Sequence, residues 1–405
     1  MTRLAERMAR VGPSPTMRVP IAAERLRRRG VHVVDLGVGE PDFATPAHVK
    51  AAAHAAIDAD FTRYTANAGI EELRAAICAR YRADFGVTYT PEEVIVSAGG
   101  KQALVNAALA LFGPGDEVVT HAPGWPSLVQ QIALAEAAPV VVRGHADEGF
   151  ALGADAFLAA VTPRTRGFVI NSPCNPTGAV MPEPELARIA DAAAARGLWL
   201  VLDLCYDRLI YDDVPPNLPR VVAERARDRG VLCGSASKAY AMTGWRCGWA
   251  LAPAPVIAAC DALQSHSTSN VSSVTQRAAL AAVTGPQDCV AAMREEYRRR
   301  RDVARALFTA DPRVRAANPS GAFYLFLDVT DALSPDGVRT SAELADRLLE
   351  EHHVATMPGE AFDAPGFLRV SFAASLESLR EGAARLHALI DAIAPDSHLG
   401  AAPGR

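Results

Sequence analysis

Val231-Leu-Cys-Gly-Ser-Ala-Ser-Lys238 joins a short apolar run to two hydroxyl side chains and an amine. Arg246 follows eight residues later, in Met242-Thr-Gly-Trp-Arg246-Cys-Gly-Trp. The apolar run predicts a buried strand, so the polar residues lie just beyond its end. These groups suit a cofactor with an aldehyde and a phosphate: the lysine forms a Schiff base, and Ser235, Ser237 and Arg246 bind phosphate oxygens. Taken alone, a Ser-x-Ser-Lys segment is more often a solvated loop.

The length and composition of the chain are those of a folded enzyme. Half of its 405 residues are hydrophobic and 21% are charged, so we expect a large core and two domains of unequal size. The net charge of −5 gives no basic footprint for nucleic acid or an anionic membrane. The chain contains no run of eighteen apolar residues, so the sequence predicts no membrane span.

The cysteines and histidines indicate neither disulfides nor a metal. The seven cysteines form no Cys-x-x-Cys pair and have no zinc-type spacing to histidine, which predicts reduced thiols in a cytoplasmic protein. The first ten residues contain no apolar stretch of signal-peptide length. The ten histidines lack metal-ligand spacing, so we expect no metal site.

Short apolar segments alternate with Ala/Leu-rich helical stretches through most of the chain. Their unbroken apolar character predicts strands covered on both faces, as in parallel sheets. We therefore expect an α/β fold in which a large cofactor-binding domain, 46–285, contains a mainly parallel, seven-stranded, doubly wound sheet. The expected strands are 94–97, 117–120, 139–142, 166–170, 198–202, 231–233 and 248–252, with helices such as 101–112, 126–137 and 184–196.

The two ends of the chain predict a smaller α+β domain. The N-terminal segment 1–45 is expected to join the small C-terminal domain 286–395, and the Gly/Ala/Pro-rich tail 396–405 is expected to be frayed. The expected elements are a helix at 21–29, an apolar segment at 31–36, a helix at 286–309, a strand in 321–328, a helix near 341–352, a strand at 367–372 and a helix near 376–393.

Chemically distinctive residues follow four of the predicted strands. Gly99-Gly100 opens a helix after the first, Asn171-Ser-Pro-Cys-Asn-Pro-Thr-Gly178 follows a second, Asp203 ends a third, and the segment 235–238 follows a fourth. In open α/β sheets, ligands bind beyond the carboxyl ends of the strands, so we expect these loops to form one site. The two glycines suit an anion at a helix start, although an ordinary tight turn explains them as well.

Four further side chains suit a pyridine-containing cofactor. Asp203 closes the apolar run 198–202, where a carboxylate needs a cationic partner such as a protonated ring nitrogen; a helix cap is the alternative. Tyr206 and Asn175 suit the phenolic oxygen of the same ring, and their alternatives are a core aromatic and a turn. Trp125 suits stacking on the ring or packing in the core.

Arg369 lies inside Phe367-Leu-Arg-Val-Ser-Phe372, a predicted strand. A guanidinium in such a place needs an anionic partner. A substrate carboxylate bound by two parallel hydrogen bonds is one candidate, and a neighbouring aspartate or glutamate is the other.

Taken together, these residues resemble those of the fold type I pyridoxal-phosphate enzymes. More narrowly, the chain resembles the class I aminotransferases of the bacterial aspartate/aromatic aminotransferase branch. The resemblance runs from about Pro13 to Ile390. The motifs that carry it, in the order of the family, are Pro13-Ser-Pro-Thr16, Gly39-Glu-Pro-Asp-Phe43, Tyr64-Thr, Gly99-Gly-Lys-Gln102, Asn175-Pro-Thr-Gly178, Ser235-Ala-Ser-Lys238, Thr243-Gly-Trp-Arg246, Ser267-Thr-Ser-Asn270, Gly321-Ala-Phe-Tyr324 and Arg369.

The resemblance implies a pyridoxal 5'-phosphate cofactor. Lys238 would be the Schiff-base lysine and the proton shuttle, Asp203 the partner of the ring nitrogen, and Asn175 and Tyr206 the contacts of the phenolic oxygen. Tyr64 would come from the other subunit of a homodimer to complete the phosphate site. The residues implied around the phosphate are Gly99, Gly100, Lys101 through its backbone, Ser235, Ser237 and Arg246.

The resemblance also implies how the substrate is held. Gly39 and Arg369 would bind the α-carboxylate. In the branch that accepts acidic substrates, the lysine of Gly-Gly-Lys-Gln helps to recognise a side-chain carboxylate, so the Lys101 side chain is a candidate selector. The residues expected to contact the substrate are Thr16, Gly39, Lys101, Trp125, Asn175 and Arg369.

Three departures from the family pattern affect the expected substrate. Gly124 stands where an aromatic is usual, Leu128 replaces a common tyrosine, and Asp203-Leu-Cys-Tyr206 differs from Asp-Glu-x-Tyr. These changes favour a substrate larger than aspartate. The prediction is therefore an aminotransferase that moves the amino group between an acidic or bulky α-amino acid and a 2-keto acid.

Two other functions stay open at this point. A lyase or a β/γ-replacement enzyme, including a carbon–carbon bond-forming one, would use the same scaffold and cofactor. A cofactor-binding regulator without catalysis would need a DNA-binding domain, for which the sequence gives no sign. Formation of a keto acid would distinguish an aminotransferase from both.

Overall fold

The structure is a computed structural model that describes residues 5–13, 15–212 and 215–393. The expected tail 396–405, and Ser14 of the first motif, lie outside the described residues. Contacts divide the chain into two units. The described residues of Met1–Gly12, Glu40–Glu296 and Ser320–Ala322 form the large unit, and those of Pro13–Gly39, Tyr297–Pro319 and Phe323–Arg405 form the small unit.

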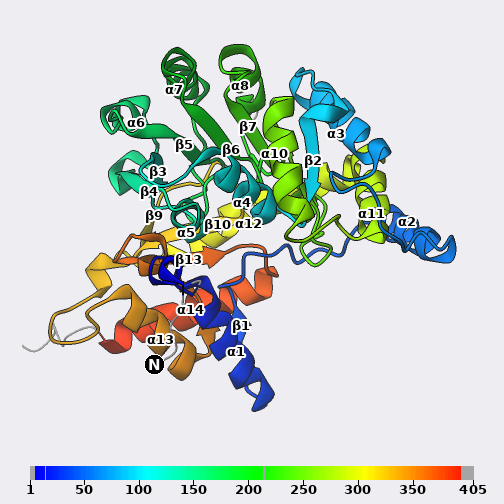
Figure 1. Cartoon of the computed structure of the whole chain (residues 1–405). Helices are drawn as coiled ribbons and strands as arrows, with labels where there is room; N and C mark the ends of the chain where they lie inside the picture. Colours follow the sequence, from blue (N-terminus) through cyan, green and yellow to red (C-terminus); the bar gives the residue numbers. More distant parts are fainter. Residues whose placement is uncertain (1–4, 14, 213–214, 394–405) are drawn as a thin grey trace, which may run out of the picture. The chain divides into compact units, whose positions relative to one another are not determined.

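The large unit is built on a seven-stranded sheet with the order β2-β8-β7-β6-β5-β3-β4 (Figure 1). The pairs from β7 to β4 are parallel, and only β8 runs antiparallel to its neighbours, β2 and β7. All seven strands coincide with the predicted apolar runs, which confirms the mainly parallel α/β class. Their bounds are β2 Val94–Ser97, β3 Glu117–Ala122, β4 Ala138–Arg143, β5 Thr165–Asn171, β6 Trp199–Asp203, β7 Gly230–Ser235 and β8 Gly248–Leu251.

Helices cover both faces of this sheet, and β6 shows why its strands are apolar throughout. Leu200 and Leu202 belong to a core cluster that also contains residues of α3, α7 and α11. Val201, which points to the opposite face, belongs to a second cluster with residues of α4, α5 and α10. The helices are α2 Ala47–Asp58, α3 Glu71–Phe85, α4 Gly100–Leu111, α5 Pro126–Leu134, α6 Ala154–Ala159, α7 Glu183–Arg196, α8 Leu218–Arg225, α9 Ala236–Ala239, α10 Ala254–Ser265 and α11 Ser273–Thr284.

The small unit is an α+β structure. Its four-stranded sheet has the order β12-β13-β10-β9 and is antiparallel, and β1 pairs with β11 in parallel. The division between the units falls inside α12, between Glu296 and Tyr297. The bounds are α1 Arg18–Arg28, β1 Val34–Asp35, α12 Asp288–Phe308, β9 Arg315–Ala316, β10 Tyr324–Asp328, α13 Ser341–His352, β11 Val354–Ala355, β12 Met357–Pro358, β13 Phe367–Ser371 and α14 Leu376–Ile393.

Two predicted helix boundaries were wrong. The helix expected at 21–29 begins at Arg18. Pro20 therefore lies in its first turn, where a missing N–H costs no hydrogen bond. The helix expected at 126–137 ends at Leu134, because Glu136 has a φ of 63° and β4 begins two residues later.

The described residues contain neither a membrane-spanning helix nor a cluster of metal-ligating side chains. None of their helices combines the length and apolar character needed to cross a membrane. Across the same residues, no group of three or more histidine, cysteine, aspartate or glutamate side chains is arranged to hold a metal ion.

Candidate active site

The ends of neighbouring strands bring the predicted polar residues of the large unit together. The sheet register pairs Asn171 of β5 with Asp203 of β6, and Asp203 with Cys233 of β7. Ser235, at the end of β7, is paired with Gly248 of β8. The loops that carry Asn175, Tyr206 and Lys238 therefore leave the same edge of the sheet, as expected of parallel strands.

One part of this edge is a cradle for an anion at the start of α4. Gly99 has a φ of 86°, and a Cβ at this position would stand 2.5 Å from Nη2 of Arg246. The Arg246 guanidinium is held by the carbonyl oxygens of Thr243, at 2.9 Å, and Ala98, at 3.3 Å. The guanidinium thus lies beside the backbone N–H groups of the first turn of α4. Together these donors suit an anionic group.

Two serines add hydroxyl groups from β7 and α9. Ser235 caps α9, since its Oγ accepts a hydrogen bond from the Ser237 backbone N–H at 3.0 Å. The two hydroxyl oxygens lie 2.8 Å apart, and both residues are buried. Hydroxyls, a guanidinium and a helix N-terminus together have the donor chemistry of a phosphate site, so these residues fit the phosphate of the predicted cofactor.

Asp203 is a buried carboxylate at the end of β6, with 2% of its surface exposed. Its Oδ1 accepts a hydrogen bond from the Cys205 backbone N–H at 3.0 Å. Burial raises the pKa of Asp203, while this hydrogen bond and the positive charge of Lys238 act in the opposite direction. A cationic ring nitrogen would stabilise the ionised carboxylate further, so Asp203 fits the partner of a protonated pyridine.

Lys238, Tyr206 and Asn175 complete the set at this sheet edge. The Lys238 Nζ lies 6.0 Å from the centroid of the Tyr206 ring. Asn175 and Tyr206 are buried, and the Asn175 backbone N–H donates to Oδ1 of Asn171 at 2.8 Å. The structure thus places an amine and a phenol side by side on segments that follow β6 and β7.

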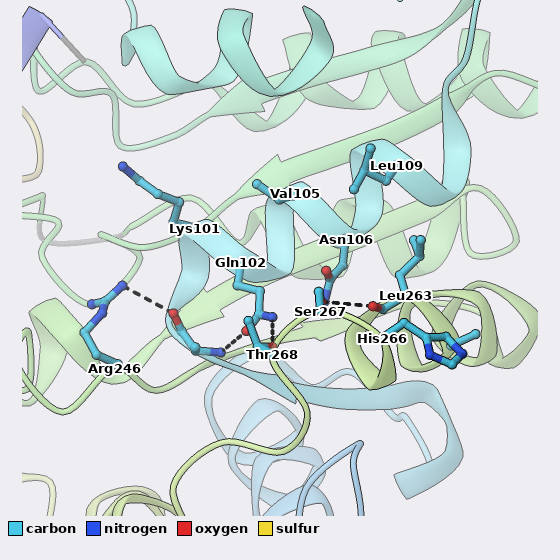
Figure 2. Close-up of a pocket in the computed structure, with 12 residues that line it drawn as sticks. Lys101, Gln102, Val105, Asn106, Leu109, Arg246, Leu263, His266, Ser267 and Thr268 are labelled. Atoms are coloured by element: carbon cyan, nitrogen blue, oxygen red, sulfur yellow. Dashed lines mark hydrogen bonds between the residues drawn. The ribbon is translucent and has the colours of Figure 1, made fainter. Parts of the chain in front are cut away.

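Lys101 and Trp125 form a second pair beside the cradle. The Lys101 Nζ lies 4.9 Å from the centroid of the Trp125 ring, within the range of a cation–π interaction. Burial and the nearby charge of Arg246 lower the pKa of Lys101. Figure 2 shows the side chains of Lys101 and Arg246 at the same end of α4, at the edge of a cavity of about 770 Å³ that also reaches Leu263 of α10.

The two departures near Trp125 have different structural settings. A Cβ on Gly124 would overlap the carbonyl oxygen of His121, so the turn leaves no space for an aromatic side chain there. Leu128 is 1% exposed and packs in the same core cluster as Ile132. Leu128 is therefore a core residue of α5, and the partly buried Trp125 packs against the same cluster.

The small unit holds the predicted carboxylate-binding residues. Arg369 is 3% exposed on β13, and its Nη2 donates to the Gly37 carbonyl oxygen at 2.6 Å. Its guanidinium carbon lies 4.3 Å from the centroid of the Tyr324 ring, and a Cβ on Gly39 would overlap the Tyr324 hydroxyl oxygen. A side chain at position 39 would therefore collide with the Tyr324 hydroxyl group, and glycine avoids this collision.

Two other predicted residues lie on separate segments, one in each unit. Tyr64, in the large unit, is 91% exposed. Thr16 lies in the 3-10 helix Pro15–Met17 of the small unit and is half-buried.

His121, at the end of β3, is a residue that the sequence reasoning missed. It is 2% exposed and hydrogen-bonded through both ring nitrogens, to the Asn171 backbone N–H and the Pro123 carbonyl oxygen. The available signal was a polar residue that directly follows the apolar strand 117–120 and precedes the loop of Trp125.

The family is decided by sequence comparison. The profile described as "Aminotransferase class I and II" matches residues 31–386. The chain belongs to this aminotransferase family. The match confirms the family resemblance that was inferred from the motifs. The members of this family that the chain resembles are pyridoxal-phosphate enzymes, and the chain is a pyridoxal-phosphate-dependent aminotransferase.

Individual relatives of this aminotransferase align over almost their whole length. An aspartate/prephenate aminotransferase of Cereibacter sphaeroides is 42% identical over 96% of this chain and 98% of its own. An aspartate aminotransferase of Geobacillus stearothermophilus is 38% identical over 96% and 99% of the two chains. None of these similarities supports the lyase or replacement alternative.

Solved aminotransferase structures agree with the fold. The aspartate aminotransferase of Rhizobium meliloti has a TM-score of 0.92 and 36% identity, over 97% of this chain and all of the other. The Thermus thermophilus enzyme with maleate has a TM-score of 0.90 and 41% identity, over 96% of this chain and all of its own. The predicted fold type I architecture is confirmed.

Proposed function

We propose that this aminotransferase takes its amino group from a dicarboxylic amino acid such as aspartate and passes it to a 2-keto acid, including a bulky one of the prephenate type. The observation that carries the proposal is the ammonium group of Lys101 beside Trp125, next to the anion cradle. A cation that lines the same cavity as Arg246 of the cradle suits a second carboxylate on the substrate. The printed names of the relatives, which include aspartate and prephenate, support the same substrate class.

The residues of the large unit would hold the cofactor in three places. Ser235, Ser237, Arg246 and the backbone N–H groups of Gly100 and its neighbours would bind the phosphate. Asp203 would face the ring nitrogen, and Asn175 and Tyr206 the phenolic oxygen. When bound, pyridoxal phosphate supplies an aldehyde carbon that takes up the amino group and a ring that withdraws electrons from the substrate Cα.

Lys238 would perform the proton transfer. Its Nζ, once neutral, accepts the proton of the substrate Cα and returns it at a neighbouring carbon, which is general acid–base catalysis by one group. The buried carboxylate of Asp203 interacts electrostatically with the ammonium group of Lys238. Asp203 therefore helps to stabilise positive charge at the site.

Arg369 would bind the α-carboxylate of the substrate. Its guanidinium is buried, held by the Gly37 carbonyl oxygen and packed on the Tyr324 ring, so its planar donors are fixed before the substrate arrives. Gly39 would add its backbone beside Tyr324, and Thr16 would line the distal end of the substrate. Trp125 and Asn175 would contact both the substrate and the cofactor.

We further propose a homodimer in which Tyr64 of one subunit reaches the phosphate of the other. Tyr64 is 91% exposed in the single chain, and a phenol in that position has a use if a second chain completes the site. We also propose a cytoplasmic location, which the seven free cysteines support.

A single-turnover half-reaction tests the proposed function. The cofactor-loaded enzyme is mixed with aspartate, glutamate or phenylalanine in the absence of a keto acid, and the released keto acid is assayed. We expect close to one oxaloacetate per active site from aspartate, and subsequent amination of prephenate when it is added. Release of no keto acid from any of the three donors would contradict an aminotransferase of this substrate class.

A further inference from the structure

We propose that His121 is a positioning residue of the aminotransferase reaction, which fixes the strand ends that carry Asn175, Asp203 and Trp125. The proposal deepens the proposed function, because it assigns support for the residues that would contact the cofactor ring. It is carried by a chain of hydrogen bonds that runs from β3 to β5 and β6.

The hydrogen bonds of His121 fix one form of its ring. Nε2 lies 3.1 Å from the Asn171 backbone nitrogen, which donates to it, so Nε2 carries no proton. Nδ1 lies 3.2 Å from the Pro123 carbonyl oxygen and therefore carries the proton. The imidazole is thus a neutral bridge between two backbone segments. Burial lowers the pKa of His121 to about 4, so the ring keeps this form at neutral pH.

Asn171 connects His121 by hydrogen bonds to Asn175 and Asp203, the residues proposed to contact the cofactor ring. Its backbone N–H is held by His121, its Oδ1 accepts from the Asn175 backbone N–H at 2.8 Å, and its Nδ2 donates to the Asp203 carbonyl oxygen at 3.3 Å. A shift of Asn171 would therefore move Asn175 and the end of β6 together. Hydrogen-bonded neighbours that orient contacting groups commonly affect activity although they touch no substrate.

The other side of His121 supports the loop of Trp125. The Pro123 carbonyl oxygen, which accepts from the imidazole, also accepts from the Cys174 thiol at 3.5 Å. The next residue, Gly124, lies so close to the His121 carbonyl oxygen that a Cβ would overlap it. Trp125 then begins α5 as its N-cap residue. The glycine that departs from the family pattern is thus the residue that lets this loop fold around His121.

A purely structural role for His121, as a satisfied polar residue in the core, is the alternative. Three substitutions separate the two roles. His121→Gln places an amide oxygen near the position of Nε2 and keeps the acceptor for Asn171. His121→Asn places its amide near Nδ1 and keeps only the donor to Pro123, and His121→Leu removes both. All three remain neutral, so charge is not a variable.

The readouts are kcat and KM for aspartate and the pH titration of the visible absorbance of the cofactor-loaded enzyme. We expect His121→Leu and His121→Asn to lower kcat about tenfold to hundredfold and to shift the absorbance titration, because the Asn171 N–H loses its partner. We expect His121→Gln to restore kcat to within about threefold and to restore the titration. Thermal unfolding of each variant is measured alongside.

Thr120→Val is the matched control, one residue earlier on β3. Thr120 is fully buried, and its Oγ1 has no hydrogen-bond partner among the described residues, so the substitution removes a polar atom without breaking the chain of hydrogen bonds. We expect its kcat and its absorbance titration to match those of the wild type. If all three His121 variants change only the unfolding temperature, or if Gln and Asn behave alike, the positioning role is wrong.

The absorbance titration also separates this proposal from the proposed function. It needs no amino acid, so it reports on Asn175 and Asp203 even if aspartate proves not to be the donor. A shift in the Leu and Asn variants with recovery in the Gln variant supports the role of His121 for any substrate. If His121→Leu does not fold, the comparison of Gln with Asn decides the question.

Discussion

Arg246 occupies the space that a side chain on Gly99 would need. A Cβ on Gly99 would stand 2.5 Å from Nη2 of Arg246, and the backbone there has a φ of 86°. Both facts require glycine, because a Cβ is strained at this φ and would displace the guanidinium. The start of α4 and the arginine are therefore fitted to one another, and the phosphate-binding role proposed for them depends on this fit.

The Gly99→Ala variant should bind pyridoxal phosphate at least about tenfold more weakly, because the shifted guanidinium loses charge-assisted hydrogen bonds to the phosphate. The dissociation constant follows from a titration of the cofactor-free protein by visible absorbance. Gly113→Ala is the control, since a Cβ at Gly113 meets no atom within 4 Å and its φ is not positive. Equal affinity of the two variants would contradict the proposed cradle.

Lys101 should select substrates by charge. Replacing it with glutamine removes the cation beside Trp125 and keeps most of the side-chain length. We expect KM for aspartate to rise about tenfold, and KM for phenylalanine, which lacks the second carboxylate, to change less than about threefold. Steady-state kinetics with both donors measure this. A parallel rise for the two donors would show that Lys101 does not read the second carboxylate.

Asp207 should make the stability of the fold fall as the pH rises. Burial raises the pKa of this carboxyl group to about 7, above the ordinary value of 3.8 that it has in an unfolded chain. Between these values the folded state holds a proton that the unfolded state has lost, so the free energy of unfolding decreases with pH. The stabilising effect is complete below about pH 4 and is lost as the pH passes 7.

The Asp207→Asn variant tests this slope. The amide cannot lose a proton and its oxygen still accepts the Arg208 backbone N–H that stabilises the carboxylate. We expect the wild type to lose up to about 1.4 kcal/mol per pH unit relative to the variant between pH 5 and 6, the value for one proton. Denaturant unfolding of both proteins at several pH values gives the difference. Parallel curves would mean that Asp207 ionises normally.

The sequence predicted the large sheet well because the fold itself imposes the signal. Strands covered on both faces must be apolar throughout, and residues such as Leu200, Val201 and Leu202 fill the two opposite core clusters. Polar residues at strand ends, such as Asp203, then stand out against that background. Fold class and the grouping of the polar loops could therefore be predicted from residue type alone.

The remaining features depend on contacts that residue type does not encode. His121 looks like a core histidine in the sequence, and only the two backbone partners of its ring reveal a bridge. Leu128 stands where the family commonly has a tyrosine, and only the structure shows that it is buried in a core cluster. The helix α1 begins three residues before the predicted start, because proline is tolerated in a first helical turn.

The homodimer can be tested by combining two inactive variants. Tyr64→Ala should leave the unfolding temperature nearly unchanged, because the side chain is 91% exposed in the single chain, yet weaken cofactor binding. Lys238→Ala should abolish amino transfer. If each site uses Lys238 of one chain and Tyr64 of the other, a mixed dimer has one site with both defects and one site with neither.

Activity should therefore return when the two variants are unfolded together and refolded as a mixture. Half of the dimers formed at random are mixed, and each has one intact site of two, so the expected recovery is about one quarter of the wild-type activity under cofactor concentrations that leave Tyr64→Ala unloaded. Refolding each variant alone is the control. A mixture that stays as inactive as its components would place Tyr64 and Lys238 in the same chain's site, and a Tyr64→Ala variant that is active by itself would place Tyr64 outside the site.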